Sequence, residues 1–135
     1  MKRQMARGFE LARGFELALI AMGLAVTLCT GSVMAQATIT NGILTDPKGM
    51  TLYTYDKDVR NSGKSTCVGG CAAIWPPLIA DETAKLERNF SIVTRESGRR
   101  QLAYKGKPLY TWIKDQKPGD TSGNGVGKVW RTAKP

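Results

Sequence analysis

The chain has 135 residues, the size of one compact domain, and its 20 lysines and arginines against 11 aspartates and glutamates give a formal net charge of +9. It contains no histidine. This composition excludes a Ser-His-Asp triad and a histidine-ligated metal centre, and it leaves the cysteines without a nearby imidazole to stabilise a thiolate.

Residues 1–35 have the three parts of a secretory signal peptide. A basic start is followed by the apolar run LALIAMGLAVTL, from Leu17 to Leu28, which is short for a membrane span. Small residues around Ala35 then offer a cleavage site before Gln36. We therefore expect an exported protein, periplasmic or secreted, that begins at Gln36. An uncleaved membrane anchor is the alternative.

Cleavage would leave two of the three cysteines, Cys67 and Cys71. An even pair in an oxidising compartment is expected to form a disulfide. The loop that it closes is very small, so by the chain-entropy estimate the bridge contributes only about 2 kcal/mol and acts as a local staple. A redox-active pair is the alternative, although such pairs more often have two intervening residues.

The exported part contains an internal repeat. The segment LYTYDKD, beginning at Leu52, returns as LYTWIKD, beginning at Leu109, 57 residues later, and a Lys-Gly pair precedes each copy. Residues 36–135 are therefore predicted to form one two-repeat domain, with the first repeat at about 38–94 and the second at about 95–135.

Each repeat is predicted to contain a hairpin, because runs rich in aromatic and β-branched residues flank the Lys-Gly turn. Ile39–Thr45 should pair with Thr51–Tyr55, and Gln101–Tyr104 should pair with Leu109–Trp112. A polar loop rich in glycine follows each motif.

Short helices and a terminal strand complete the predicted elements. Residues 71–75 support one helical turn, because Pro76 halts it, and residues 81–88 are predicted to form a second short helix. Val129 and Trp130 would close the sheet as a last strand. The predicted fold is mainly β: a small single domain of two hairpin repeats forming one antiparallel sheet or sandwich, with one or two short helical turns.

The repeated motif supplies the main candidate site, which consists of Tyr53, Tyr55, Asp58, Tyr110, Trp112 and Asp115. Residues two apart on a strand share a face, so each motif presents two rings to one side of the sheet. Such rings are most often core residues, and the carboxylates would then cap turn amides or accept a tyrosine hydroxyl. If the rings instead line a cleft, they would hold a flat or cationic ligand.

Both motif copies fit the pattern Tyr, any residue, aromatic, two residues, Asp. The chain thereby resembles the secreted repeat family of unknown function, also described as predicted lipoproteins with this motif, and TCVGGCAAIWPPL and PGDTSGNGVGKVW are similar to stretches of that family. The resemblance implies an exported bacterial protein with two repeats and no known reaction; some relatives accompany redox or copper proteins of the envelope. Cys29 does not fit lipid attachment, because Leu28 before it is too large.

The positive charge lies mostly in the second repeat. Residues 36–94 hold 6 basic and 6 acidic residues, whereas residues 95–135 hold 10 and 3. This excess favours an anionic envelope component, an acidic protein or a membrane surface as partner, and no nucleic acid is expected. A solvated face that aids solubility is the alternative. The predicted basic patch consists of Arg99, Arg100, Lys105, Lys107, Lys114, Lys117, Lys128 and Arg131.

The leading hypothesis is a non-catalytic module that binds a partner through its loops and its basic second repeat. The alternatives are a redox or copper-handling accessory protein that uses Cys67 and Cys71, and a structural envelope component. No catalytic residue, cofactor or metal site is predicted, since the carboxylates lack the spacing of an acid–base pair and residues 119–128 lack the phosphate-loop pattern. Nothing in the sequence predicts an enzyme.

Overall fold

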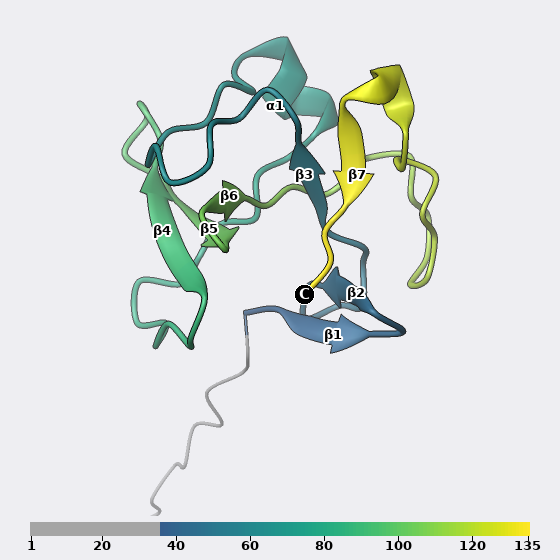
Figure 1. Cartoon of the computed structure of the whole chain (residues 1–135), viewed down its shortest axis with the longest axis horizontal. Coiled ribbons are helices and arrows are strands. Elements are labelled where there is room, and N and C mark those ends of the chain that lie inside the picture. Colours follow the sequence, from purple (N-terminus) through teal and green to yellow (C-terminus); the bar gives the residue numbers. More distant parts are fainter. Residues whose placement is uncertain (1–35) are drawn as a thin grey trace, which may run out of the picture. The chain divides into compact units, whose positions relative to one another are not determined.

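The computed structural model describes residues 36–135, and the predicted signal peptide at 1–35 lies outside the described residues. The described part is mainly β, as predicted (Figure 1). Its elements are β1 (Thr38–Thr40), β2 (Ile43–Thr45), β3 (Tyr53–Tyr55), α1 (Gly70–Ile74), β4 (Phe90–Thr94), β5 (Arg100–Tyr104), β6 (Lys107–Pro108), the 3-10 turn η1 (Val126–Lys128) and β7 (Trp130–Thr132). No helix between residues 36 and 135 has the length and apolar character needed to span a membrane.

The first predicted hairpin is present only next to its turn. Ile39–Thr45 is not one strand, because Asn41 and Gly42, at φ 51° and 77°, turn the chain back and pair β1 with β2. An Asn-Gly pair favours this type of two-residue turn, since both positions need a positive φ. Around the Lys-Gly pair, a bridge between Thr45 and Thr51 and a hydrogen bond from the Leu52 N–H to the Leu44 carbonyl oxygen join the expected partners, but β3 itself pairs with β7.

The second predicted hairpin is partly present. β5 pairs with β6 around the turn at 105–106, and β4 lies on the other edge of β5. Leu109 still donates to Leu102 of β5, but the next residue, Tyr110, forms bridges with Tyr53 and Pro77 instead. Strand β4 was not predicted, although its aromatic and β-branched residues are typical of a strand.

Two closed rings of backbone hydrogen bonds show how the repeats are combined. In the first ring, the backbone N–H of Leu44 donates to the carbonyl oxygen of Ala133 (2.8 Å). The N–H of Ala133 donates to the carbonyl oxygen of Leu52 (2.8 Å), and the N–H of Leu52 donates to that of Leu44 (2.9 Å). In the second, Leu102 donates to Leu78 (2.8 Å), Leu78 to Leu109 (2.9 Å) and Leu109 to Leu102 (3.0 Å). Each ring takes two members from one repeat and the third from the end of the other. The repeats therefore exchange their C-terminal segments, and Figure 1 shows the consequence as β7 lying beside β3.

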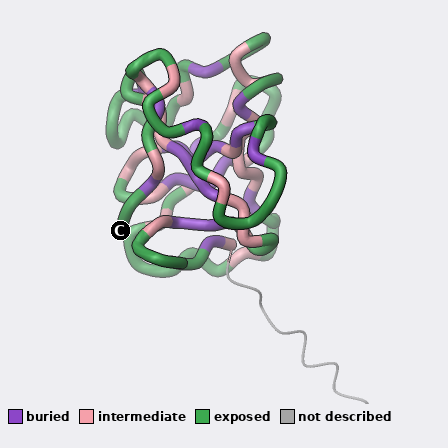
Figure 2. The backbone as a smooth tube through the Cα atoms, turned by 90° about the vertical axis from the view of Figure 1, so that its right-hand side faces the viewer, coloured by how far each residue is buried: buried purple, intermediate pink, exposed green. Residues whose placement is uncertain are grey.

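The buried side chains form two clusters, and Figure 2 shows the buried segments enclosed by exposed turns. The aliphatic cluster contains Ala37, Leu44, Leu52, Ala80, Leu102, Leu109 and Ala133. The aromatic cluster contains Tyr53, Cys67, Trp75, Tyr110, Trp112 and Trp130. Neighbouring residues on a strand point to opposite faces, so Leu52 joins the aliphatic cluster and Tyr53 the aromatic one. The motif strands thus separate the two clusters.

The predicted helical turn at 71–75 is confirmed as α1, and the terminal strand is confirmed as β7. The predicted helix at 81–88 is wrong. The carboxylate of Asp81 accepts hydrogen bonds from the backbone N–H and the hydroxyl of Thr83, at 2.8 and 2.7 Å, which fixes a local turn in place of a helix. Leu86 is 42 % exposed, so this segment has no apolar face to pack a helix.

Candidate functional site

The two motif tyrosines meet at the centre of the domain. The backbone N–H of Tyr53 donates to the carbonyl oxygen of Tyr110 at 2.8 Å, and the reverse bond is 3.0 Å long. This exchange makes Tyr53 and Tyr110 an antiparallel pair, and both side chains are completely buried. The two motifs therefore run past one another in opposite directions, which brings the end of each motif close to the start of the other.

Each tyrosine is hydrogen-bonded to the aspartate of the other motif. The Tyr53 hydroxyl donates to Oδ2 of Asp115 at 2.6 Å, and the Tyr110 hydroxyl donates to Oδ2 of Asp58 at 2.5 Å. Burial, and then the hydrogen bond to the carboxylate, raise the pKa of both tyrosines well above the usual value. Both hydroxyls thus stay protonated and act as donors.

The second oxygen of each carboxylate closes the loop that follows its motif. Oδ1 of Asp58 accepts from the backbone N–H and the hydroxyl of Thr66, both at 2.7 Å. Oδ1 of Asp115 accepts from the same two groups of Ser122, at 3.0 and 2.6 Å. In this structure each aspartate therefore both caps turn amides and accepts a tyrosine hydroxyl, and it ties two distant parts of the chain together.

Four stacked rings fill the space beside the crossed pairs. Their order is Tyr55, Trp130, Trp75 and Trp112, with successive centroid distances of 4.3, 3.8 and 3.9 Å. We call this set the aromatic column. Tyr53 meets Trp75 edge-on at 5.4 Å, and Tyr110 meets Trp130 edge-on at 5.1 Å. The arrangement has the same contacts from either end, as expected for two repeats related by a pseudo-twofold axis.

Trp75 and Trp130 were not among the predicted site residues. Each stands at the end of the loop after a motif, 17 residues beyond Asp58 and 15 residues beyond Asp115, and this common position is the signal that could have identified them. Gly123 was also missed. A Cβ atom at Gly123 would lie 2.8 Å from Trp75 and 2.9 Å from Tyr53, so the loop has no room for a side chain there.

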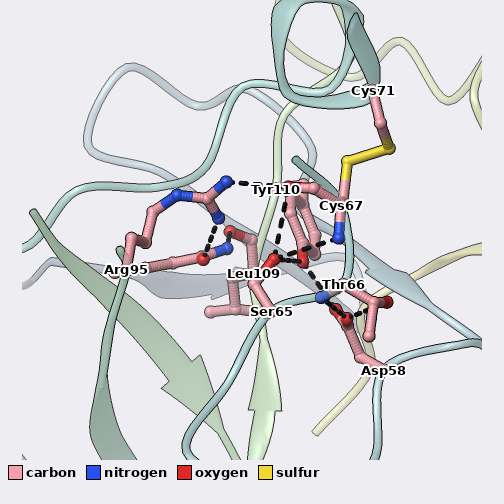
Figure 3. The surroundings of a disulfide bond; sticks show 9 residues. Asp58, Ser65, Thr66, Cys67, Cys71, Arg95, Leu109 and Tyr110 are labelled. Carbon is pink, nitrogen blue, oxygen red and sulfur yellow. Dashed lines mark hydrogen bonds between the residues drawn. A yellow bond between two sulfur atoms is a disulfide. The ribbon is translucent and has the colours of Figure 1, made fainter. Parts of the chain in front are cut away.

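The disulfide between Cys67 and Cys71 lies beside the Tyr110–Asp58 pair, as Figure 3 shows. Cys67 is fully buried in the aromatic cluster, whereas Cys71 is half-buried. The Ser65 hydroxyl is hydrogen-bonded to the Tyr110 hydroxyl at 2.6 Å, and Arg95 donates to the carbonyl oxygen of Cys67 at 2.7 Å (Figure 3). The bridge thus braces the loop that supports one of the two crossed pairs.

Reducing this bridge is expected to lower the free energy of unfolding by about 2 kcal/mol, because it closes only a short loop. Urea unfolding with and without a reductant measures the change. The control is Cys67→Ala with Cys71→Ala, whose stability should not respond to the reductant. Far-ultraviolet circular dichroism should stay the same, and complete unfolding on reduction would contradict the role of a local staple.

The eight residues of the predicted basic patch come from three segments of the second repeat. One segment holds Arg99, Arg100, Lys105 and Lys107, the next holds Lys114 and Lys117, and the last holds Lys128 and Arg131. Two of the eight residues form ion pairs: Lys117 with Asp120 at 3.2 Å and Arg131 with Asp56 at 3.0 Å. The positive charge of these two residues is therefore balanced locally.

An arginine of the first repeat joins the basic turn of the second. Nη1 of Arg60 donates to the carbonyl oxygen of Lys105 at 2.9 Å, and the backbone N–H of Asn61 donates to Gly106 at 2.9 Å. These contacts hold the loop after the first motif against the β5–β6 turn. We call Arg60, Lys105 and Lys107 the basic group. Arg60 was not predicted, since only the fold brings it to this turn.

The aromatic column reaches a surface pocket at its Trp112 end. The pocket has a volume of about 180 Å³ and is lined by Trp112, Asp115 and Thr111, together with side chains of the turn at 46–51. Within residues 36–135, no group of three or more acidic or cysteine side chains lies in an arrangement that could hold a metal ion.

A family model described as a secreted repeat of unknown function matches the chain in two segments, residues 37–79 and 91–134. Each segment contains one copy of the tyrosine–aspartate motif and the tryptophan that follows it. Neither a curated protein nor a solved structure matches the chain.

Proposed function

Because this chain belongs to the family of secreted repeats of unknown function, we propose that it is an exported, non-catalytic module that binds an anionic component of the bacterial envelope. It acts in the periplasm or outside the cell, after removal of the signal peptide near Ala35. Five of the six motif residues are buried and hold the core together, which supports a role for the loops and the basic turns in meeting a partner.

The basic group is the observation that carries this proposal. Arg60 and Lys105 are exposed and Lys107 is half-buried, and none of the three forms an ion pair with an acidic residue in the described part of the chain. Like charges held close together repel one another, and a bound anion relieves this repulsion. Two segments of the fold thus place three uncompensated cations around one turn.

Anionic lipid headgroups are the chemistry that this group fits. Each lysine or arginine close to an anionic membrane surface contributes about 1 kcal/mol, and salt screens the attraction beyond about a Debye length. Two of the three side chains are exposed, as expected for a contact with a surface. A binding curve that weakens with rising salt is therefore expected.

Replacing the basic group by Arg60→Gln, Lys105→Gln and Lys107→Gln is expected to weaken binding to anionic vesicles by about 3 kcal/mol, roughly a hundredfold. The measurement is co-sedimentation of the protein with vesicles that contain phosphatidylglycerol, compared with vesicles of phosphatidylcholine alone. Binding only to the first kind is the expected result.

The matched control is Lys48→Gln with Lys85→Gln and Lys134→Gln. It removes three exposed positive charges that lie outside the basic group, so the net charge falls by the same amount. Equal loss of binding in both triple variants would show that overall charge alone attracts the vesicles. Binding to polyglutamate but not to vesicles would assign an acidic protein as the partner, and binding to neither would contradict the proposal.

A further inference from the structure

All three tryptophans of the chain lie in the aromatic column. Trp75 is stacked between Trp130 and Trp112, with interplanar angles of 5° and 26°, and Tyr55 continues the stack on Trp130 at 17°. Near-parallel rings at these distances overlap through their π-systems. Indole and phenol rings are also among the side chains that most readily lose one electron, so the column is a continuous series of oxidisable groups.

The column has a tyrosine–carboxylate pair on either side. Tyr53 touches Trp75 and donates a 2.6 Å hydrogen bond to Asp115, and Tyr110 touches Trp130 and donates a 2.5 Å bond to Asp58. A phenol that loses an electron becomes a strong acid and releases its proton. A carboxylate oxygen at hydrogen-bond distance can accept that proton with almost no movement of heavy atoms.

One end of the column is accessible from the surface pocket described above. Trp112 lines this pocket, and so does Asp115, although each is only 8 % exposed. A small oxidant in the pocket can therefore take an electron from the indole edge without reaching the centre of the domain.

From these contacts we infer that the aromatic column is a relay for one-electron oxidation, which carries an oxidising equivalent from Trp112 to the buried tyrosines. The oxidant class that it takes is a small one-electron oxidant, such as an oxygen-centred radical, that fits the pocket. The relay goes beyond the proposed binding role and does not depend on it, because it uses no residue of the basic group.

The electrons and protons of the step balance. The radical in the pocket gains one electron from Trp112 and is reduced, and Trp75 then gives one of its own electrons to the oxidised Trp112. Tyr53 then gives one electron to Trp75, and its O–H bond breaks as the proton passes to Oδ2 of Asp115. The products are a reduced oxidant, a neutral tyrosyl radical and a protonated carboxyl group. The second branch runs through Trp130 to Tyr110 and Asp58.

Pulse radiolysis with the azide radical tests this relay, because that small oxidant attacks tryptophan in preference to tyrosine. In the unaltered protein, the visible absorption of the tryptophan radical should decay as the near-ultraviolet absorption of the tyrosyl radical rises. The two rates should be equal and independent of protein concentration. Decay of the tryptophan radical without a tyrosyl signal, or a rate that depends on concentration, would overturn the inference without any substitution.

Substitutions of single tyrosine sets then show which tyrosine carries the final radical. Tyr53→Phe with Tyr110→Phe should abolish the tyrosyl signal and leave a long-lived tryptophan radical, whereas Tyr104→Phe, outside the column, should change nothing. A tyrosyl signal that persists in the double variant would place the radical on Tyr55 or Tyr104 and refute the assignment. Asp115→Asn, which keeps the shape but is a poor proton acceptor, should slow the transfer. Near-ultraviolet circular dichroism checks that each variant is folded.

Discussion

Replacing Trp75 with alanine is expected to destabilise the domain by about 3 to 5 kcal/mol. Trp75 is only 2 % exposed, and it has Trp130 stacked on one face and Trp112 on the other. Truncation would leave two large rings facing a cavity. A small domain is stable by only about 5 to 15 kcal/mol in total, so this one change removes much of its stability. Urea unfolding followed by far-ultraviolet circular dichroism measures the loss.

Two further variants test whether that loss of stability comes from the aromatic column. Trp75→Phe keeps an aromatic ring between the neighbours and should cost less than the alanine variant. Phe90→Ala removes a half-buried ring that packs against Tyr104 at 4.9 Å, outside the aromatic column, and should also cost less. If Phe90→Ala were as damaging as Trp75→Ala, the column would have no special weight in the stability of the domain.

A double-mutant cycle between Tyr53 and Asp115 is expected to give a coupling energy of about 1 to 2 kcal/mol. Tyr53→Phe and Asp115→Ala should each be destabilising, by about 1.5 to 3 kcal/mol, because each breaks a buried hydrogen bond that involves a charged group. The double variant should lose less than the sum of the two, since both changes remove the same bond. The four free energies of unfolding supply the measurement.

The matched control is the cycle between Tyr53 and Asp58, which belong to the same motif. No hydrogen bond joins these two side chains in the structure, so their effects should add. Coupling between Tyr53 and Asp58 together with additivity between Tyr53 and Asp115 would mean that each motif closes on itself. That result would contradict the crossed arrangement.

The sequence contains enough information to predict the repeat, the β class, α1 and β7. The sequence patterns did not predict which strands pair with one another. The two motifs have nearly the same residues, and similarity of this kind cannot say whether Tyr53 pairs within its own repeat or with Tyr110. The Asn-Gly turn at 41–42 is a hairpin signal, but β-branched residues lie on both sides of it, and the prediction joined them into one strand. The predicted helix at 81–88 failed because the side-chain bonds of Asp81 compete with helix formation.

The residues of the candidate site were easier to find than their arrangement. The motif aromatics and aspartates stand out because they recur, and the structure brings all six into one region. Trp75 and Trp130 lie outside the repeated heptapeptide, so their stacking emerges only when the two loops fold back on the motifs. Arg60 likewise reaches Lys105 through a contact between segments 45 residues apart. Such long-range contacts depend on topology, which local periodicity does not encode.

The exchange of C-terminal segments means that the unit repeated along the sequence is not the unit that folds. One repeat by itself lacks the third member of its hydrogen-bonded ring and the carboxylate that its buried tyrosine requires. Two copies of a one-repeat chain would supply both to each other, so the domain has the arrangement of a symmetric homodimer within a single polypeptide. Within one polypeptide, equivalent positions of the two repeats can carry different residues. In this chain one loop carries the Cys67–Cys71 bridge, while the other carries Gly123 at the matching place.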